Sequence, residues 1–170
     1  GWRLNQESFL RDVEWIDELK LRAGFGVTGN QDFDNYRSLL LMQTDGYFYN
    51  NGKWQNTYTP KSNANPLLGW EKKSEWNVGV DFSFWQGRLS GAIDYYFRRT
   101  TDLLYEYDVP VPPYDYNVFF TNVGEITNQG IEVTLSGIPV MTRNFRWSTT
   151  LTLAHNENKL VKFTNEEFKN

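Results

Sequence analysis

Apolar and polar residues alternate along several long segments of the chain. In residues 19–27 the odd positions are apolar, whereas the even positions are lysine, arginine or glycine. The alternation is clearest in residues 70–85, where the apolar positions are Trp76, Val78, Val80, Phe82 and Phe84. A repeat of two residues predicts β-strands that have one apolar face.

The same alternation predicts further strands at residues 88–104, 122–137 and 145–160, with a short stub at 1–4. The segment Gln86-Gly87-Arg88 is short and contains glycine, which predicts a hairpin between the strands on either side of it. Continuing the alternation across this turn places Asp81 and Asp94 together on the polar face. The predicted arrangement is therefore an antiparallel, up-and-down meander.

The connections between the predicted strands differ in length. Residues 138–144 are expected to form a short turn that contains Pro139, because proline lacks the N–H that the interior of a sheet requires. Residues 28–69 and 105–121 are long connections, and both lie on the other side of the meander. Residues 5–18 are expected to hold a helical turn, since apolar side chains recur there at helical spacing.

The strand predicted at residues 70–85 exceeds the usual length of strands in globular proteins. Residues 70–85 contain no proline and would extend over roughly 53 Å at about 3.3 Å per residue. Crossing a bilayer requires only about 9 to 11 residues of strand. Aromatic residues at both ends of the segment match the girdles of membrane barrels. A soluble sandwich alternates with the same period, so the pattern alone leaves both architectures open.

The composition excludes several classes of protein. A net charge of −4 offers no basic surface for nucleic acid. The absence of cysteine rules out disulfide scaffolds, cysteine zinc sites and thiol catalysis, and His155 is the single histidine. No phosphate-binding or nucleophile-elbow motif occurs. We therefore expect no catalytic residue, metal site, cofactor or enzymatic activity in this chain.

The first long connection carries a candidate ligand-binding surface. Its aromatic side chains are interspersed with asparagine and glutamine, a combination that suits stacking on sugars and hydrogen bonding to sugars or peptides. The candidate ligand-binding residues are Tyr47, Tyr49, Trp54 and Tyr58. The alternative is a β-hairpin inside the loop, with these aromatic side chains packed against neighbouring loops.

Several blocks of the sequence resemble one protein family. They are GWRLNQESF at residues 1–9, LKLRAGFGVTGNQ at 19–31, NPLLGWEKKSEWNVGVDFSFWQGRLSGAIDYYFRRTTDLL at 65–104, NVGEITNQGIEVTLSG at 122–137 and FRWSTTLTLAHNENKLV at 145–161. In this order and spacing they look like the C-terminal half of SusC/RagA-type TonB-linked outer-membrane transporters. The chain is accordingly expected to be all-β and to form a segment of a large transmembrane β-barrel, because its five full strands fall short of the eight at which bacterial barrels begin.

The resemblance also implies a function and partners. The whole protein would lie in the outer membrane of a Gram-negative bacterium, in contact with its lipid, and import nutrients such as a glycan or a peptide. It would work with a SusD-like surface lipoprotein and with TonB, which would act through regions outside this chain. Residues 28–69 and 105–121 would be outer loops. The alternative function is a soluble extracellular β-domain that binds a glycan or a protein.

Overall fold

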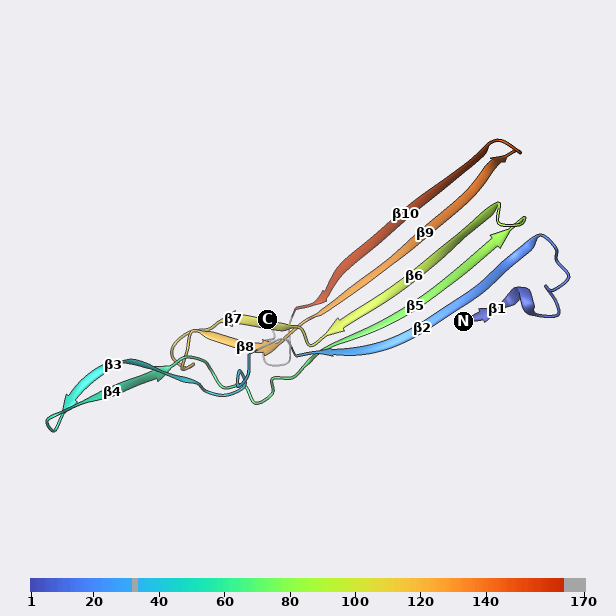
Figure 1. Cartoon of the computed structure of the whole chain (residues 1–170). Coiled ribbons are helices and arrows are strands. Elements are labelled where there is room, and N and C mark those ends of the chain that lie inside the picture. The colour runs from blue at the N-terminus through green and yellow to red at the C-terminus, as the bar shows by residue number, and fades with distance from the viewer. Residues whose placement is uncertain (32–33, 164–170) are drawn as a thin grey trace. The chain divides into compact units, whose positions relative to one another are not determined.

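The dominant element of the computed structural model, which describes residues 1–31 and 34–163, is a six-stranded sheet (Figure 1). Its strands, in spatial order, are β1 (Trp2–Arg3), β2 (Ile16–Asn30), β5 (Glu71–Phe84), β6 (Leu89–Thr101), β9 (Glu125–Met141) and β10 (Arg146–Lys162). The spatial order follows the chain order, and successive long strands run in opposite directions. The prediction of an all-β, antiparallel, up-and-down meander is confirmed.

Both long connections contain a two-stranded ribbon of their own. In the first connection, β3 (Met42–Asn50) pairs with β4 (Lys53–Pro60), and in the second, β7 (Leu104–Asp108) pairs with β8 (Val118–Asn122); both pairs are antiparallel. The second connection is therefore not a plain loop. The segment 122–137, predicted as one strand, is divided between the end of β8 and the start of β9.

The turn expected at 138–144 is shorter than predicted. Strand β9 continues to Met141 and includes Pro139, and the chain then reverses through a hydrogen bond from Thr142 N to Phe145 O of 2.8 Å. The Ile138 N–H donates to Arg88 O, the residue just before β6, over 2.8 Å. Pro139 thus lies beyond Leu89, the residue at which β6 begins, so its missing N–H removes no hydrogen bond to that strand.

Helical structure is confined to the N-terminal region of the described residues. A 3₁₀ helix, η1, covers Leu4–Gln6. The helical turn expected within 5–18 is represented by one hydrogen bond of α-helical spacing, from Arg11 N to Glu7 O over 2.8 Å. In the part of the chain that the structure describes, no helix has the length and apolar character that spanning a membrane requires.

The chain divides into two compact units. The sheet unit comprises Gly1–Thr28, Lys73–Arg99 and Ile126–Leu160, and the loop unit comprises Gly29–Lys72, Thr100–Glu125 and Val161–Asn170. Among the described residues, the buried hydrophobic side chains are Phe119 and Val123, which both belong to the loop unit. Within its described residues, the sheet unit has no comparable core of its own.

The two faces of the sheet unit differ in chemistry. On one face Arg22 reaches both Asp81 and Asp94, each over 2.8 Å, so the predicted common face of these two aspartates is confirmed. On the other face Phe25 packs on Trp76 with 4.2 Å between ring centroids. Trp76 and Val78 remain 56% and 52% exposed. A soluble sandwich would bury such an apolar face, whereas the wall of a membrane barrel presents it to lipid.

Glycines on the polar face of the sheet unit are of two kinds. A Cβ at Gly130 would lie 2.6 Å from the Tyr96 hydroxyl oxygen and 2.8 Å from the His155 carbonyl oxygen. A Cβ at Gly79 would meet the Asp94 carboxylate and lie 2.9 Å from Arg22 Nη2. At Gly26, by contrast, no atom lies within 4 Å of the corresponding position. Gly130 and Gly79 therefore provide space for neighbouring side chains, and Gly26 borders open space.

Candidate functional site

The predicted aromatic residues lie on the β3–β4 hairpin of the loop unit. Asn51 and Gly52 connect the two strands with φ angles of +49° and +79°. Positive φ at both positions is the type I′ turn that the sequence Asn-Gly favours. A two-residue turn fixes the pairing of the strands, and Tyr49 accordingly lies opposite Trp54.

The register gathers all four predicted residues on one face of the hairpin. Tyr47 pairs with Asn56 and Thr44 pairs with Tyr58, with an irregularity between Thr44 and Gly46 that omits Asp45 from the pairing. Paired residues share a face, and so do residues two apart along a strand. The shared face carries Tyr47, Tyr49, Trp54 and Tyr58, which we call the aromatic face. Phe48, paired with Gln55, lies on the opposite face.

The aromatic face is open rather than packed. Its four side chains are between 60% and 72% exposed. Tyr49 and Trp54 contact each other edge to face, with ring centroids 5.3 Å apart. An open row of aromatic rings with the Asn56 amide among them can stack on a sugar or an apolar side chain and hydrogen-bond to its polar groups.

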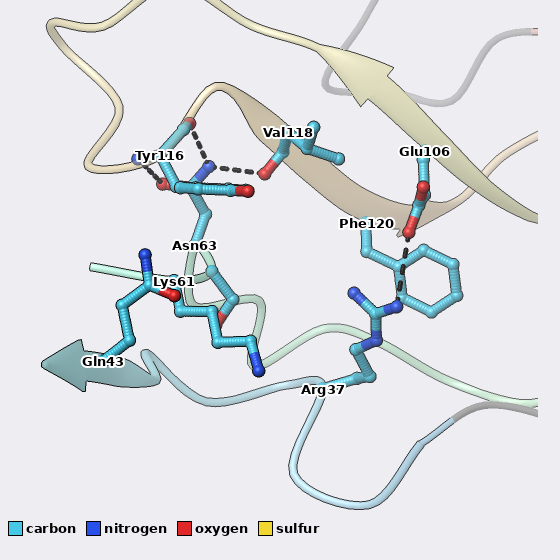
Figure 2. Close-up of a pocket in the computed structure, with 9 residues that line it drawn as sticks. Arg37, Gln43, Lys61, Asn63, Glu106, Tyr116, Val118 and Phe120 are labelled. Atoms are coloured by element: carbon cyan, nitrogen blue, oxygen red, sulfur yellow. Dashed lines mark hydrogen bonds and ion pairs between the residues drawn. The ribbon is translucent and has the colours of Figure 1, made fainter. Parts of the chain in front are cut away.

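A pocket of about 250 Å³ lies elsewhere in the same unit (Figure 2). Its lining comes from β3 and the segments next to β3 and β4, and from the β7–β8 ribbon and the connection between its strands. The lining residues are Arg37, Gln43, Lys61, Ser62, Asn63, Glu106, Tyr116, Val118 and Phe120. The sequence predicts none of them as site residues, because the segments that form the pocket are far apart along the chain.

Asparagine side chains hold the walls of this pocket together. The buried Asn63 amide donates to the carbonyl oxygens of Tyr116 and Val118 over 2.6 and 2.7 Å, and its oxygen accepts from Asp115 N and Tyr116 N over 3.0 Å each. Asn65 donates in the same way to Phe120 O over 2.9 Å. These bonds fasten residues 63–65 to the β8 segment, so the pocket is preformed.

The charges at the pocket are unevenly paired. The Arg37 guanidinium lies 3.4 Å from a Glu106 carboxylate oxygen and 3.6 Å from an Asp34 oxygen, and it sits 5.3 Å from the centre of the Phe120 ring. Lys61 lines the same pocket, and no acidic side chain among the described residues forms an ion pair with its ammonium. Arg37 and Lys61 thus outnumber Glu106 in the pocket lining.

A cluster of rings occupies another part of the loop unit. Tyr105 lies between Tyr107 and Phe163, with ring centroids 5.2 and 4.9 Å away. Burial, and secondarily Tyr105, raise the pKa of the Tyr107 phenol above its ordinary value. The phenol therefore keeps its proton, and it donates to Phe163 O over a long 3.4 Å. The three rings contact one another, and Tyr105 and Phe163 remain 45% and 41% exposed.

Comparison with known proteins identifies the family. Residues 2–168 match the family model described as "TonB dependent receptor-like, beta-barrel". The chain belongs to the TonB-dependent receptor β-barrel family. Among curated members, it is 37% identical over 169 residues to the TonB-dependent receptor SusC of Bacteroides thetaiotaomicron, and 33% identical over 168 residues to the TonB-dependent receptor P39 of Formosa agariphila.

A solved structure supports the same family. The chain superposes on the RagAB peptide transporter with a TM-score of 0.77 and 25% identity, covering 95% of this chain and 17% of that one. The alignment with SusC includes 96% of this chain and 17% of SusC, and the alignment with P39 includes 98% of this chain and 16% of P39. The chain thus spans about a sixth of the length of the TonB-dependent receptors it matches. Membership of this family favours the barrel segment over the soluble β-domain.

Proposed function

We propose that this chain is a wall segment of a TonB-dependent importer in the outer membrane of a Gram-negative bacterium. The match of residues 2–168 to the receptor barrel family carries the proposal. The exposed apolar face of the sheet unit, with Trp76 and Val78, supports it, because lipid is the environment in which such a face is stable. In this proposal the segment forms part of the wall of a transport barrel and carries no catalytic site.

The imported nutrient is a glycan or a peptide, and the aromatic face takes part in binding it. One similar structure is described as a peptide transporter, which favours a peptide. The ring-and-amide chemistry of Tyr47, Tyr49, Trp54 and Tyr58 suits either ligand. The whole protein would work with a SusD-like surface lipoprotein and with TonB, as the family resemblance implies.

The importer role predicts which connections face outward. In transmembrane barrels the short turns are periplasmic and the long loops are extracellular. In the full-length protein, Lys53→Cys in the hairpin should react with a membrane-impermeant thiol reagent on intact cells. Asn144→Cys, in the short turn after β9, should react only after the outer membrane is permeabilised. Labelling of Asn144→Cys alone on intact cells would contradict the proposed sidedness.

Removing one ring from the aromatic face should weaken ligand binding. Trp54→Ala in the full-length protein is expected to cost about 1 kcal/mol, or roughly fivefold in affinity, because the ligand no longer stacks on that ring. Titration calorimetry of the detergent-solubilised protein with a panel of peptides and oligosaccharides would measure the change. Phe48→Ala, on the opposite face of the same hairpin, is the matched control and should leave affinity unchanged. If Trp54→Ala instead lowers only barrel assembly, the aromatic face serves packing.

A further inference from the structure

We propose that the pocket lined by Asn63 binds a carboxylate group of the imported ligand, with Lys61 as its main cationic contact and Arg37 as the second. This inference rests on the importer role proposed above, and it adds a site separate from the aromatic face. Three properties of the pocket support it: its size, its rigidity and its charge.

The size of the pocket suits one end of a ligand. Whole-ligand pockets occupy about 300–1,000 Å³, and this one measures about 250 Å³. Asn63 is 8% exposed, and its amide forms four hydrogen bonds to backbone groups of residues 115–118. The walls are therefore in place before a ligand arrives, so little ordering opposes binding.

The charge of the lining selects an anion. Lys61 has no ion pair with an acidic side chain in the described part of the chain, and Figure 2 shows an ion-pair line from Arg37 to Glu106 but none from Lys61. The contacts of Arg37 with carboxylates, at 3.4 and 3.6 Å, are longer than good hydrogen bonds. A guanidinium has five N–H donors, so Arg37 retains donors for a ligand.

The number of charges selects a singly charged group. Arg37 already faces Glu106 and, outside the lining, Asp34, so the charge that a ligand would balance is that of the Lys61 ammonium. Glu106 would repel a doubly charged phosphate more strongly than a carboxylate. A carboxylate also matches the fork of donors that arginine presents. Peptide C-termini and uronic acids both carry this group, and the experiment separates them.

The test uses two matched pairs of probes on the full-length, detergent-solubilised protein. One pair is N-acetyl-trialanine and its C-terminal amide, and the other is trigalacturonate and its trimethyl ester, in which all three carboxylates are esterified. Titration calorimetry at low salt should show that at least one acid binds about tenfold more tightly than its uncharged twin, the scale of one charge-assisted contact. The pair that responds identifies the source of the carboxylate.

Lysine variants then locate the preference. Lys61→Met should abolish the preference for the acid, and Lys61→Arg should retain most of it. Lys53→Met removes the same charge from the hairpin, outside the pocket, and should leave the preference intact. The inference is overturned if neither acid is preferred over its twin, which includes the absence of any binding at millimolar concentration, or if the preference survives in Lys61→Met.

The failure of this inference can be told apart from the failure of the importer role. If each acid and its uncharged twin bind equally, while Trp54→Ala still weakens ligand binding, only the carboxylate site is rejected. Loss of the outward labelling of Lys53→Cys rejects the importer role itself, whatever the probes show.

Discussion

Replacing Gly130 by valine will destabilise the sheet by about 3 kcal/mol. A Cβ at this position would lie 2.6 Å from the Tyr96 hydroxyl oxygen and 2.8 Å from the His155 carbonyl oxygen. Tyr96 can rotate away, but the carbonyl belongs to the neighbouring strand, so β9 and β10 must move apart. Thermal unfolding of the full-length barrel in detergent would measure the loss.

Gly26 provides the matched control for this prediction. It also lies in a strand of the sheet unit, and nothing lies within 4 Å of the Cβ that valine would add. Gly26→Val should therefore change stability by less than about 0.5 kcal/mol, since valine is also the better strand former. If the two variants are destabilised equally, a steric clash at Gly130 is not the reason that glycine is needed at this position.

Replacing Arg22 by methionine will cost about 2 kcal/mol. Arg22 Nε and Nη2 donate to the two Asp81 oxygens over 2.8 Å each, and Nη2 also lies 2.8 Å from an Asp94 oxygen. Without the guanidinium, two neighbouring carboxylates repel each other, and in the described part of the chain only the more distant contact of Lys20 with Asp81 remains as an ion pair. Hydrogen bonds to charged groups contribute roughly 1.5–3 kcal/mol, and the partial exposure of the three side chains, 28–38%, limits the loss through solvation. Urea unfolding of the full-length protein would measure it.

Two further variants isolate the cause of the Arg22 effect. Lys20 lies 3.8 Å from Asp81, so Lys20→Met removes a cation from the same face that attracts this carboxylate only weakly. It should cost less than about 0.5 kcal/mol. Combining Arg22→Met with Asp81→Asn and Asp94→Asn should recover most of the stability, because no unpaired charge remains. A triple variant as unstable as Arg22→Met alone would assign the effect to packing.

The regular sheet is predictable from sequence because its information is local. Alternation around Asp81 and Asp94 determines which face each residue joins, and the structure places both aspartates against Arg22. The hairpin around Asn51-Gly52 is likewise within reach, since a positive φ at both turn residues favours that pair. The sequence offers this hairpin only as the alternative to a ligand-binding loop, and the register shows that a hairpin and an open aromatic face coexist.

The features that sequence reasoning misses depend on contacts between distant residues. The sequence predicts a turn around Pro139. In the structure, β9 extends past Leu89, the first residue of β6, and this extension accommodates the proline. The pocket depends on Asn63 reaching backbone groups 52 to 55 residues further along the chain. Asparagine is common in turns for local reasons, so nothing in the sequence around Asn63 distinguishes a long-range clamp from an ordinary turn residue.

The hydrogen bonds of Asn63 and Asn65 keep the shape of the pocket independent of pH and salt concentration. Asn63 and Asn65 hold the walls through neutral amide groups, which neither gain nor lose a proton over the biological pH range. Dissolved salt screens interactions between charges, and it has little effect on buried amide hydrogen bonds. A change in ionic strength would therefore alter how strongly Lys61 attracts an anion while leaving the cavity itself in place. The affinity of the pocket for an anion and the shape of the pocket thus depend on different interactions.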